Sequence, residues 1–420
     1  MELLSYMNYI ISVIFAACYF HQLIYVIVRL VKKQKKFKSV KLSKFAVLIA
    51  ARNEETVIAQ LIESIKAQKY PSNMLDIYVV ADNCIDSTAE IARNAGATVY
   101  ERDNKVLVGK GYALNYILSI IKTEKADIHY DGYFVFDADN LLDSRYISEM
   151  NKVFTNGYEV VTGYRNAKNY GDNWISSSYG LWFLRESEYL NHPRFQMGIS
   201  CAISGTGFLF SDELIEKNGG WNYFLLTEDL EFTADRLIKD QKIGYCHSAI
   251  LYDEQPTGFI QSIQQRSRWI KGIIQVVSKY GKGLAKGIVK DGRFACYDML
   301  MGIIPVAFLT ITGFLINAAL FGYGLIFNRE QLPLFFTSIC TSIINAYLTM
   351  YAIGLLTTIT EWKKINCKNS KKIIYTFFFP LFTFSFAIAM VIAMFTNVEW
   401  HPIKHTSALS ITDLGKTYRK

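Results

Sequence analysis

Apolar and polar residues are distributed unevenly along the chain, and their distribution divides it into distinct parts. Residues 8–31 are apolar and aromatic over a length that is sufficient to cross a bilayer. Residues 299–327, 332–358 and 373–395 form three further apolar stretches, the last of which contains Pro380. Residues 45–255 instead alternate short apolar runs with amphipathic segments, as soluble domains do. We therefore predict a soluble domain held between membrane helices.

The alternation within residues 45–255 predicts an α/β domain. FAVLIAA, DIYVVAD, ATVYER and DGYFVFDAD have the pattern of strands, and EETVIAQLIESIKAQ, STAEIARNAG and GKGYALNYILSII have the pattern of helices. Strands that alternate with helices favour a mostly parallel sheet covered on both faces. In such folds ligands bind at the carboxyl ends of the strands, so polar residues at those ends are the first candidates for a site.

Basic clusters orient the predicted membrane helices. The net charge is +8, and lysines and arginines concentrate at residues 29–44 and 363–372, beside apolar stretches. Positive residues next to membrane spans mark the cytoplasmic side, which predicts a multi-pass protein of the cell membrane with a cytoplasmic soluble domain. The position of the clusters beside spans argues against a nucleic-acid partner. Residues 8–31 lack a basic n-region and a cleavage site, so we expect a retained anchor.

Three predicted strands end in acidic residues or lead to a lysine. In FDADN, Asp137 and Asp139 lie two positions apart at a strand end, where a divalent cation such as Mg²⁺ or Mn²⁺ would relieve their repulsion; an acidic turn is the structural alternative. Asp82 ends the strand in VVADNCID, with an Asx-turn as its alternative. Lys110 lies in GKG before a helix, where a phosphate or a solvated turn both fit.

Two further motifs lie later in the chain. Thr227, Glu228 and Asp229 interrupt the apolar stretch LLTEDLEF, where a carboxylate has its pKa raised and can act as a base. The same residues also suit a helix N-terminus with Thr227 as its cap. Residues 264–269, QQRSRW, precede the apolar run IKGIIQVV, which fits an interfacial helix anchored by Trp269.

As a set in the order D, DxD, TED and QxxRW, these motifs resemble the membrane-integrated processive family 2 glycosyltransferases. That group includes bacterial cellulose, β-glucan, hyaluronan, chitin and poly-N-acetylglucosamine synthases. The resemblance covers residues 45–290 and extends loosely to the flanking apolar stretches. It implies a GT-A type nucleotide-sugar-binding domain, with a mostly parallel sheet, embedded between transmembrane and interfacial helices.

The resemblance implies a domain order along the chain. The parts are a transmembrane helix with a basic linker (1–44), a cytosolic GT-A domain (45–255), interfacial amphipathic helices with QxxRW (256–298), C-terminal transmembrane helices (299–398) and a tail (399–420). One feature conflicts with this order. The tail EWHPIKHT resembles a cytosolic motif, whereas three complete C-terminal crossings would place it outside. Either residues 373–395 bend or re-enter, at Pro380 for example, or the topology differs by one crossing.

The resemblance implies a donor site for a UDP-sugar. The residues that it assigns to the nucleotide and diphosphate are Asn53, Glu54, Asp82, Lys110, Gln265 and Arg268. Asp137 and Asp139 would hold the diphosphate through a divalent metal, Mg²⁺ or Mn²⁺. A guanidinium offers several fixed donors to phosphate oxygens, which suits the role of Arg268.

The resemblance also implies an acceptor site beside a catalytic base. Asp229 would deprotonate the acceptor hydroxyl, with Glu228 and Thr227 in the same motif. The residues assigned to the acceptor are Gly205, Thr206, Glu254 and Trp269. The implied reaction is a single in-line displacement that inverts the anomeric configuration and gives a β-linked product.

The implied activity is processive polymerisation of a β-linked glucan from UDP-glucose, with β-1,4, β-1,3 or mixed linkage. The growing polysaccharide would be the acceptor and would pass through a channel between the apolar segments in the lipid bilayer. Three alternatives stay open. They are a UDP-N-acetylglucosamine-using synthase of the poly-GlcNAc, chitin or hyaluronan type, a non-processive lipid glycosyltransferase, and a transporter or scaffold with an inactive transferase domain. The intact Asp137, Asp139, Asp229 and Arg268 argue against the last of these.

Overall fold

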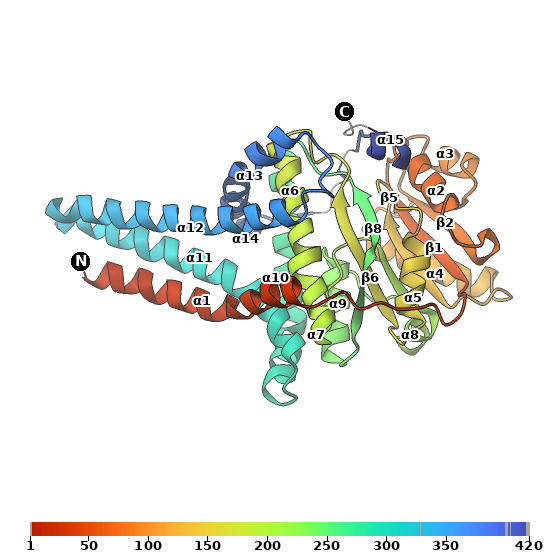
Figure 1. Cartoon of the computed structure of the whole chain (residues 1–420), viewed down its shortest axis with the longest axis horizontal. Coiled ribbons are helices and arrows are strands. Elements are labelled where there is room, and N and C mark those ends of the chain that lie inside the picture. Colours follow the sequence, from red (N-terminus) through yellow and green to blue (C-terminus); the bar gives the residue numbers. More distant parts are fainter. Residues whose placement is uncertain (1, 328, 400–401, 404, 417–420) are drawn as a thin grey trace.

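The computed structural model describes residues 2–327, 329–399, 402–403 and 405–416. Figure 1 shows an α/β domain at one end of the molecule and three long helices that extend from its other end. These are α1 (Glu2–Val31), α11 (Phe294–Phe327) and α12 (Leu332–Thr360), with the short η3 (Arg329–Gln331) between the last two. The separation agrees with the apolar and amphipathic segments of the sequence.

One eight-stranded sheet forms the centre of the domain, in the order β3-β2-β1-β4-β7-β6-β8-β5. The strands are β1 (Phe45–Ala51), β2 (Leu75–Asp82), β3 (Thr98–Arg102), β4 (Gly132–Asp137), β5 (Leu141–Leu142), β6 (Val160–Ala167), β7 (Phe208–Ser211) and β8 (Ile243–Asp253). Four neighbouring pairs are parallel, and three are antiparallel. The predicted α/β fold with a mostly parallel sheet is confirmed.

Strand direction decides where the site lies. β1 runs parallel to β2 and β4, and β2 runs parallel to β3. β7 is antiparallel to both β4 and β6, so β4 and β6 point the same way, and β8 is parallel to β6. Six strands therefore end at one edge of the sheet, where the carboxyl ends of parallel strands commonly form binding sites.

Helices cover the sheet and bury its apolar faces. They are α2 (Ile58–Lys66), η1 (Ser72–Met74), α3 (Thr88–Asn94), α4 (Lys110–Glu124), α5 (Tyr146–Phe154), α6 (Trp174–Arg185), η2 (Glu186–Asn191), α7 (His192–Met197), α8 (Asp212–Lys217) and α9 (Glu228–Ile238). The main core joins β1, β4 and β7 to α2, α4 and α5, and Phe45, Val47 and Leu48 of β1 are fully buried in it. Each such side chain stabilises the fold by about 1.5–3 kcal/mol.

The QxxRW motif lies on a single long helix, α10 (Phe259–Val289). The prediction of several interfacial helices is wrong in this respect, because the Gly/Lys-rich stretch after the motif continues the same helix. Its glycines permit close packing against neighbours. A β-carbon on Gly283 would lie 2.7 Å from Cδ1 of Ile238, at the end of α9.

Three described helices are long and apolar enough to cross a membrane, at Tyr6–Val31, Phe335–Thr360 and Asn369–Phe395. The stretch 299–327, also predicted to span, belongs to α11, in which the apolar segments Phe294–Ile304 and Ile311–Phe327 are shorter. α1 packs against α11, and α11 packs against α12. The side chains at 305–308, 310, 314 and 320 lie outside the described ones.

The last apolar segment consists of two helices, α13 (Asn369–Phe384) and α14 (Phe386–Phe395), which meet at Ser385 and not at Pro380. Both ends of the segment contact the α/β domain and α10. Lys371 Nζ donates to Gly171 O, and at the other end Lys271 Nζ of α10 donates to Ala393 O and Thr396 O. The segment therefore leaves and returns on one side, which favours the bent alternative over a complete crossing.

Candidate active site

The loops after β1 and β2 form one end of the site. Asn53 adopts a left-handed backbone conformation with φ of 58°, and its Oδ1 accepts a hydrogen bond from Ile85 N. Glu54 N donates to Thr88 Oγ1. Asp82 ends β2, is buried, and pairs with Arg102 at 2.5 Å. The structure thus brings together three of the residues assigned to the nucleotide and diphosphate, and adds Arg102, which no motif singled out.

Asp137 and Asp139 lie at the end of β4, in the middle of the same edge. Lys110 Nζ lies 2.5 Å from Asp137 Oδ1 and 2.7 Å from Gly205 O, so an ammonium group already offsets part of the acidic charge. Burial by itself lowers the pKa of Lys110, but Asp137 and Glu228 outweigh it and raise the pKa. Lys110 therefore stays charged between the DxD motif and the loop of residues 204–207, here called the Gly205 loop.

The Gly205 loop packs directly on the DxD turn. Asp137 N donates to Thr206 Oγ1 at 2.9 Å, and Thr206 Oγ1 donates to Asn140 Oδ1. Gly205 has φ of 81°, a conformation that favours glycine. A β-carbon at Gly205 would lie 3.8 Å from Asp229 Oδ2. The loop predicted to contact the acceptor thus lies beside the predicted base.

Glu228, which is buried, and Asp229, which is partly buried, form an acidic pair at the start of α9. Burial, and then the neighbouring Asp229, raise the pKa of Glu228 to about 7. Burial also raises the pKa of Asp229, while the backbone of Leu230 and the charges of Lys110 and Arg165 oppose that rise. Raised carboxylate pKa values suit a general base that works near neutral pH.

Thr227 occupies the N-cap position of α9, as predicted, but the structure records no side-chain capping hydrogen bond for it among the described residues. Its Oγ1 is buried against α10. Thr227 therefore acts as a packing residue between α9 and α10, and the expected capping role is wrong. The reason is tertiary, because Gly272 of α10 leaves room only for this side chain.

The two arginines of QQRSRW have different surroundings. Arg268 interacts electrostatically with Glu228, Asp137 and Asp229, although burial lowers its pKa. Arg266 points away from the carboxylates, is fully buried, and donates to Phe382 O and Ser385 Oγ at 2.9 and 2.8 Å. Arg266 thus satisfies the carbonyl group freed where α13 ends, a role that the sequence did not reveal.

Gln265 and Trp269 of α10 differ in their surroundings, which are polar for Gln265 and aromatic for Trp269. Gln265 Oε1 is buried and has no hydrogen-bond partner among the described residues, which leaves an acceptor free for a ligand. Trp269 packs edge-to-face on Tyr179 and Phe183, with ring centroids 5.7 and 6.1 Å apart. These residues belong to an aromatic cluster of α6, α10, α13 and α14, defined by Ile175, Tyr179, Phe183 and Phe382 with Trp174, Trp182, Trp269 and Phe386.

Strands β6 and β8 add residues that sequence reasoning missed. Arg165 Nε donates to Asp253 Oδ2 at 2.7 Å, and its Nη1 donates to Ser204 O beside the Gly205 loop. Burial raises the pKa of Asp253 to about 6, although Arg165 opposes the rise. A lone arginine on a strand carries no local signal, and only the direction of β6 places it here.

Glu254 follows β8 and joins the metal motif to the C-terminal tail. Its backbone N–H donates to Asp139 Oδ2 at 2.6 Å, and Lys168 lies 3.4 Å from its Oε2. Thr406 N and Ser407 N donate to its Oε1 at 2.9 and 3.2 Å. The prediction placed Glu254 on the acceptor side, whereas these contacts place it beside Asp139.

His405, in the tail, lies within the same site. Its Nδ1 is 2.9 Å from Glu54 Oε2, across 351 positions of sequence. Burial by itself lowers the pKa of His405, but Asp139, Glu54 and Glu254 outweigh it and raise the pKa to about 9. Burial also raises the pKa of Glu54, against the hydrogen bond from His405. The tail motif was noticed in the sequence, but its contact with Glu54 was not predictable from it.

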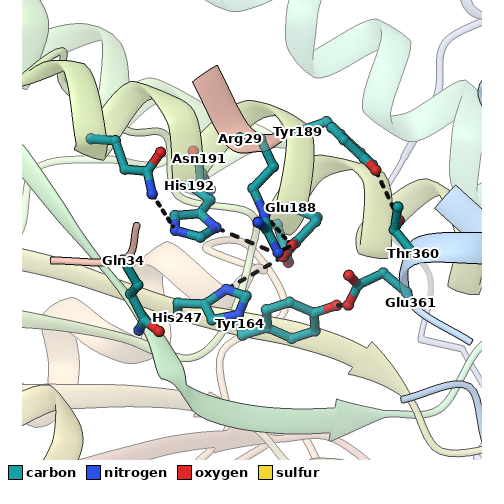
Figure 2. Close-up of polar contacts among 12 residues, drawn as sticks. Arg29, Gln34, Tyr164, Glu188, Tyr189, Asn191, His192, His247, Thr360 and Glu361 are labelled. Carbon is teal, nitrogen blue, oxygen red and sulfur yellow. Dashed lines mark hydrogen bonds and ion pairs between the residues drawn. The ribbon is translucent and has the colours of Figure 1, made fainter. Parts of the chain in front are cut away.

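A second cluster, Glu188, His192 and His247, places three potential ligand atoms within 4.8 Å of one another (Figure 2). Two cations lie beside its carboxylate, because Arg29 pairs with Glu188 and Lys364 Nζ lies 3.9 Å from Glu188 Oε2. Lys364 also lies 3.3 Å from His247 Nε2, which must then accept, so Nδ1 of the neutral ring carries the proton. Arg29 and Lys364 therefore compensate the charge of the Glu188 carboxylate.

Comparison with known proteins agrees with this geometry. Residues 43–272 match the family described as "Glycosyltransferase like family 2". The chain belongs to glycosyltransferase family 2. It is a nucleotide-sugar-dependent hexosyltransferase with a GT-A fold, and the matched region contains every motif from ARNEE to QxxRW.

Curated relatives of this family 2 transferase include two kinds of protein. The "Probable glycosyltransferase YdaM" of Bacillus subtilis is 25% identical over 367 residues, which cover 85% of this chain and 84% of that protein. A "Beta-monoglucosyldiacylglycerol synthase" of Nostoc sp. is 26% identical over 278 residues. That match covers 63% of this chain and 56% of the synthase, so the transferase spans about half the length of that relative.

A solved structure shares the fold of this transferase. The "Mannosyltransferase PcManGT from Pyrobaculum calidifontis in complex with GDP-Man and Mn2+" superposes with a TM-score of 0.54 at 16% identity. The superposition covers 92% of this chain and 99% of the mannosyltransferase. At this identity the likeness establishes the GT-A fold and nothing finer.

Proposed function

We propose that this transferase moves glucose from UDP-glucose to a hydroxyl group of a membrane lipid, such as a diacylglycerol. One observation carries the proposal. The acceptor-side Trp269 packs into the aromatic cluster that also includes Phe382 and Phe386 of the apolar helices α13 and α14. The acceptor side is therefore continuous with apolar surface, which suits an amphiphile. The name of the Nostoc relative supports the same donor and acceptor classes.

The residues divide the reaction between them. Asp229 takes the proton of the acceptor hydroxyl, whose oxygen forms a bond to the anomeric carbon of the α-linked sugar. The bond from that carbon to the diphosphate oxygen breaks, and its electron pair leaves with UDP. Arg268 interacts electrostatically with Asp137 and Asp229, and its positive charge balances the charge of the leaving diphosphate. Attack from the opposite face inverts the configuration and gives a β-glucoside.

The donor site suits a divalent metal. Asp137 and Asp139 supply carboxylate oxygens, the ligand type that Mg²⁺ and Mn²⁺ prefer, and Lys110 already holds a positive charge against Asp137. When bound, the ion would neutralise part of the charge on the diphosphate. Asn53, Glu54 and Asp82 would hold the uridine. Gln265 Oε1 would accept a hydrogen bond from the bound UDP-sugar.

The burial of the long helices argues for single transfer over polymerisation. Only 11% and 6% of the most apolar windows of Tyr6–Val31 and Phe335–Thr360 are buried, against 39% for Asn369–Phe395, so the first two helices leave most of their apolar side chains exposed. Tyr351 stacks on Tyr347 and Phe377, with centroids 6.4 and 4.8 Å apart, so these aromatic faces contact each other. Helices exposed in this way suit anchoring in lipid, with the GT-A domain in the cytoplasm as the basic flanks indicate.

The test uses the full-length protein in nanodiscs with diacylglycerol, Mn²⁺ and either UDP-glucose or UDP-N-acetylglucosamine. UDP release would be measured, and products would be separated into lipid and polymer fractions, with Asp229→Asn as the inactive control. A β-glucosyl lipid formed only by the unaltered protein supports the proposal. A long, glucanase-sensitive polymer would establish the processive alternative. Release of UDP from UDP-N-acetylglucosamine alone would overturn the choice of sugar.

A further inference from the structure

Residues 405–410, here called the strap, contact two acidic residues of the donor site. His405 Nδ1 lies 3.0 and 2.9 Å from the two carboxylate oxygens of Glu54. Thr406 N and Ser407 N donate to Glu254, and Ser407 N also reaches Glu254 Oε2 at 3.0 Å. One side chain and two backbone N–H groups therefore hold the two carboxylates.

The strap is fixed on its other side as well. Lys168 Nζ donates to Ser407 O at 3.0 Å, and the side chain of Lys168 is only 2% exposed. Ser410 Oγ and Ser410 N donate to Asp413 Oδ2, in the first turn of the helix α15 (Ile411–Lys416). In Figure 1, α15 lies at the end of the molecule where α2 and α3 lie. The strap therefore passes the donor residues Glu54 and Glu254 and leads into α15.

We propose that the strap completes the donor site and that His405 is a positioning residue, which holds Glu54 in the orientation that binds the nucleotide. This inference rests on the proposed role of Glu54 in donor binding. Without His405, Glu54 loses its hydrogen-bond partner from the strap and faces the charges of Asp139 and Asp137. Like charges at close range repel, so Glu54 would turn away from the nucleotide.

The hydrogen bond between His405 and Glu54 can be tested with a matched set of variants. His405 uses Nδ1, and the amide nitrogen of asparagine reaches the same position, so His405→Asn should keep the hydrogen bond that His405→Ala removes. His129→Ala is the control, since His129 is an exposed histidine in the loop after α4 (Lys110–Glu124). Folding of each variant would be checked by its melting temperature in detergent.

The experiment measures binding of UDP to the full-length protein with Mn²⁺ by calorimetry. His405→Ala should weaken binding about tenfold, as expected for loss of a hydrogen bond to a charged group, and His405→Asn and His129→Ala should bind within about threefold of the unaltered protein. With a diacylglycerol acceptor, the KM for UDP-glucose should rise while kcat changes little. Unchanged UDP binding in His405→Ala would overturn the proposal.

A double-mutant cycle separates positioning from a general structural role. In a Glu54→Gln background, His405→Ala should weaken UDP binding less than twofold further, because its partner is already altered. An undiminished tenfold effect in that background would overturn the proposal, since His405 would then act elsewhere. UDP binding needs no acceptor, so failure of the lipid-transfer proposal would appear separately, as intact UDP binding without a glucolipid product.

Discussion

Gly272 of α10 lies directly against Thr227 at the start of α9, so that a β-carbon on Gly272 would be 2.4 Å from Thr227 Oγ1. The contact sets the distance between the helix that carries Arg268 and the helix that carries Asp229. Two motifs that are separate in sequence, and that we propose to be catalytic, thus depend on one small residue for their spacing.

Gly272→Ala should separate α9 from α10 and lower kcat/KM at least tenfold, at a cost in stability of about 1–3 kcal/mol for the overpacked contact. Gly281→Ala on the same helix is the matched control, because its β-carbon would meet only Val277 Cγ1 at an ordinary 3.6 Å. The control should keep activity and gain up to about 1 kcal/mol from helix propensity. Equal activity of the two variants would refute the spacing role.

Substitution of Arg266 should lower the stability of the protein, whereas substitution of Arg268 should lower its catalytic rate. Arg266→Ala removes two hydrogen bonds to the end of α13 and the contact with the Phe382 ring, 4.3 Å from the guanidinium carbon. We expect a loss of roughly 2–4 kcal/mol of stability, seen as a lower melting temperature. Arg268→Ala should keep the melting temperature and lower kcat about 10²–10³-fold. The reverse pattern would show that the two roles are exchanged.

Because of the acidic pair Glu228 and Asp229, the transfer rate should fall on the acidic side of the pH–rate profile, which we call the acid limb. Because the pKa of Glu228 is raised to about 7 and that of Asp229 is also raised, the pair holds a proton at lower pH and the base is blocked. The rate should therefore rise with pH and level off above about 7. Asp229→Asn should lower kcat about 10²–10⁴-fold with UDP binding retained.

Glu228→Gln tests the coupling within that pair. Removing the neighbouring negative charge lets Asp229 ionise more easily, so the acid limb of the pH–rate profile should move to lower pH. The profile is measured with saturating UDP-glucose between pH 5 and 9. A limb that stays in place would show that the base is a group other than Asp229.

Removal of divalent metal should abolish transfer. EDTA should bring turnover to background, and Mn²⁺ or Mg²⁺ should restore it, because Asp137 and Asp139 are the proposed oxygen ligands of a metal at the donor diphosphate. Asp139→Asn should need at least tenfold more Mn²⁺ for half-maximal activity. Full activity of that variant without added metal would contradict the assignment.

The Glu188–His247 cluster should make the fold sensitive to acid. The pKa of Glu188 is lowered to about 2 and that of His247 to about 3 by their surroundings. As pH falls below about 6.5, His247 and then Glu188 therefore bind protons in the unfolded chain but not in the folded chain. Unfolding is favoured as pH falls from 6.5 towards 2, by at most about 1.4 kcal/mol per pH unit for each proton.

The measurement compares melting temperatures in detergent at pH 7.5, 6.0 and 5.0. His247→Gln should flatten the decline below pH 6.5, because the variant has no ring to protonate in the unfolded chain. His129→Gln, at an exposed loop position, should decline like the unaltered protein. Identical declines in all three proteins would show that the cluster does not govern acid stability.

The sequence by itself determined strands β1 to β4, the order of the motifs and membership of glycosyltransferase family 2. These depend on local patterns: continuous apolar runs form buried strands, and polar residues that follow them lie at the carboxyl edge of a parallel sheet. Asp82, Asp137 and Asp139 were placed correctly for that reason. Parallel strands of any such sheet end together, so no knowledge of distant contacts was needed.

Tertiary structure alone decided the remaining residues of the site and the path of the last apolar segment. Arg165 reaches the Gly205 loop because β6 points the same way as β4, and His405 reaches Glu54 because α13 and α14 bend back to the domain. Arg266 and Arg268 differ only in the side of α10 on which they lie. Each of these facts depends on a contact between segments far apart in the chain, which no local pattern of apolar and polar residues encodes.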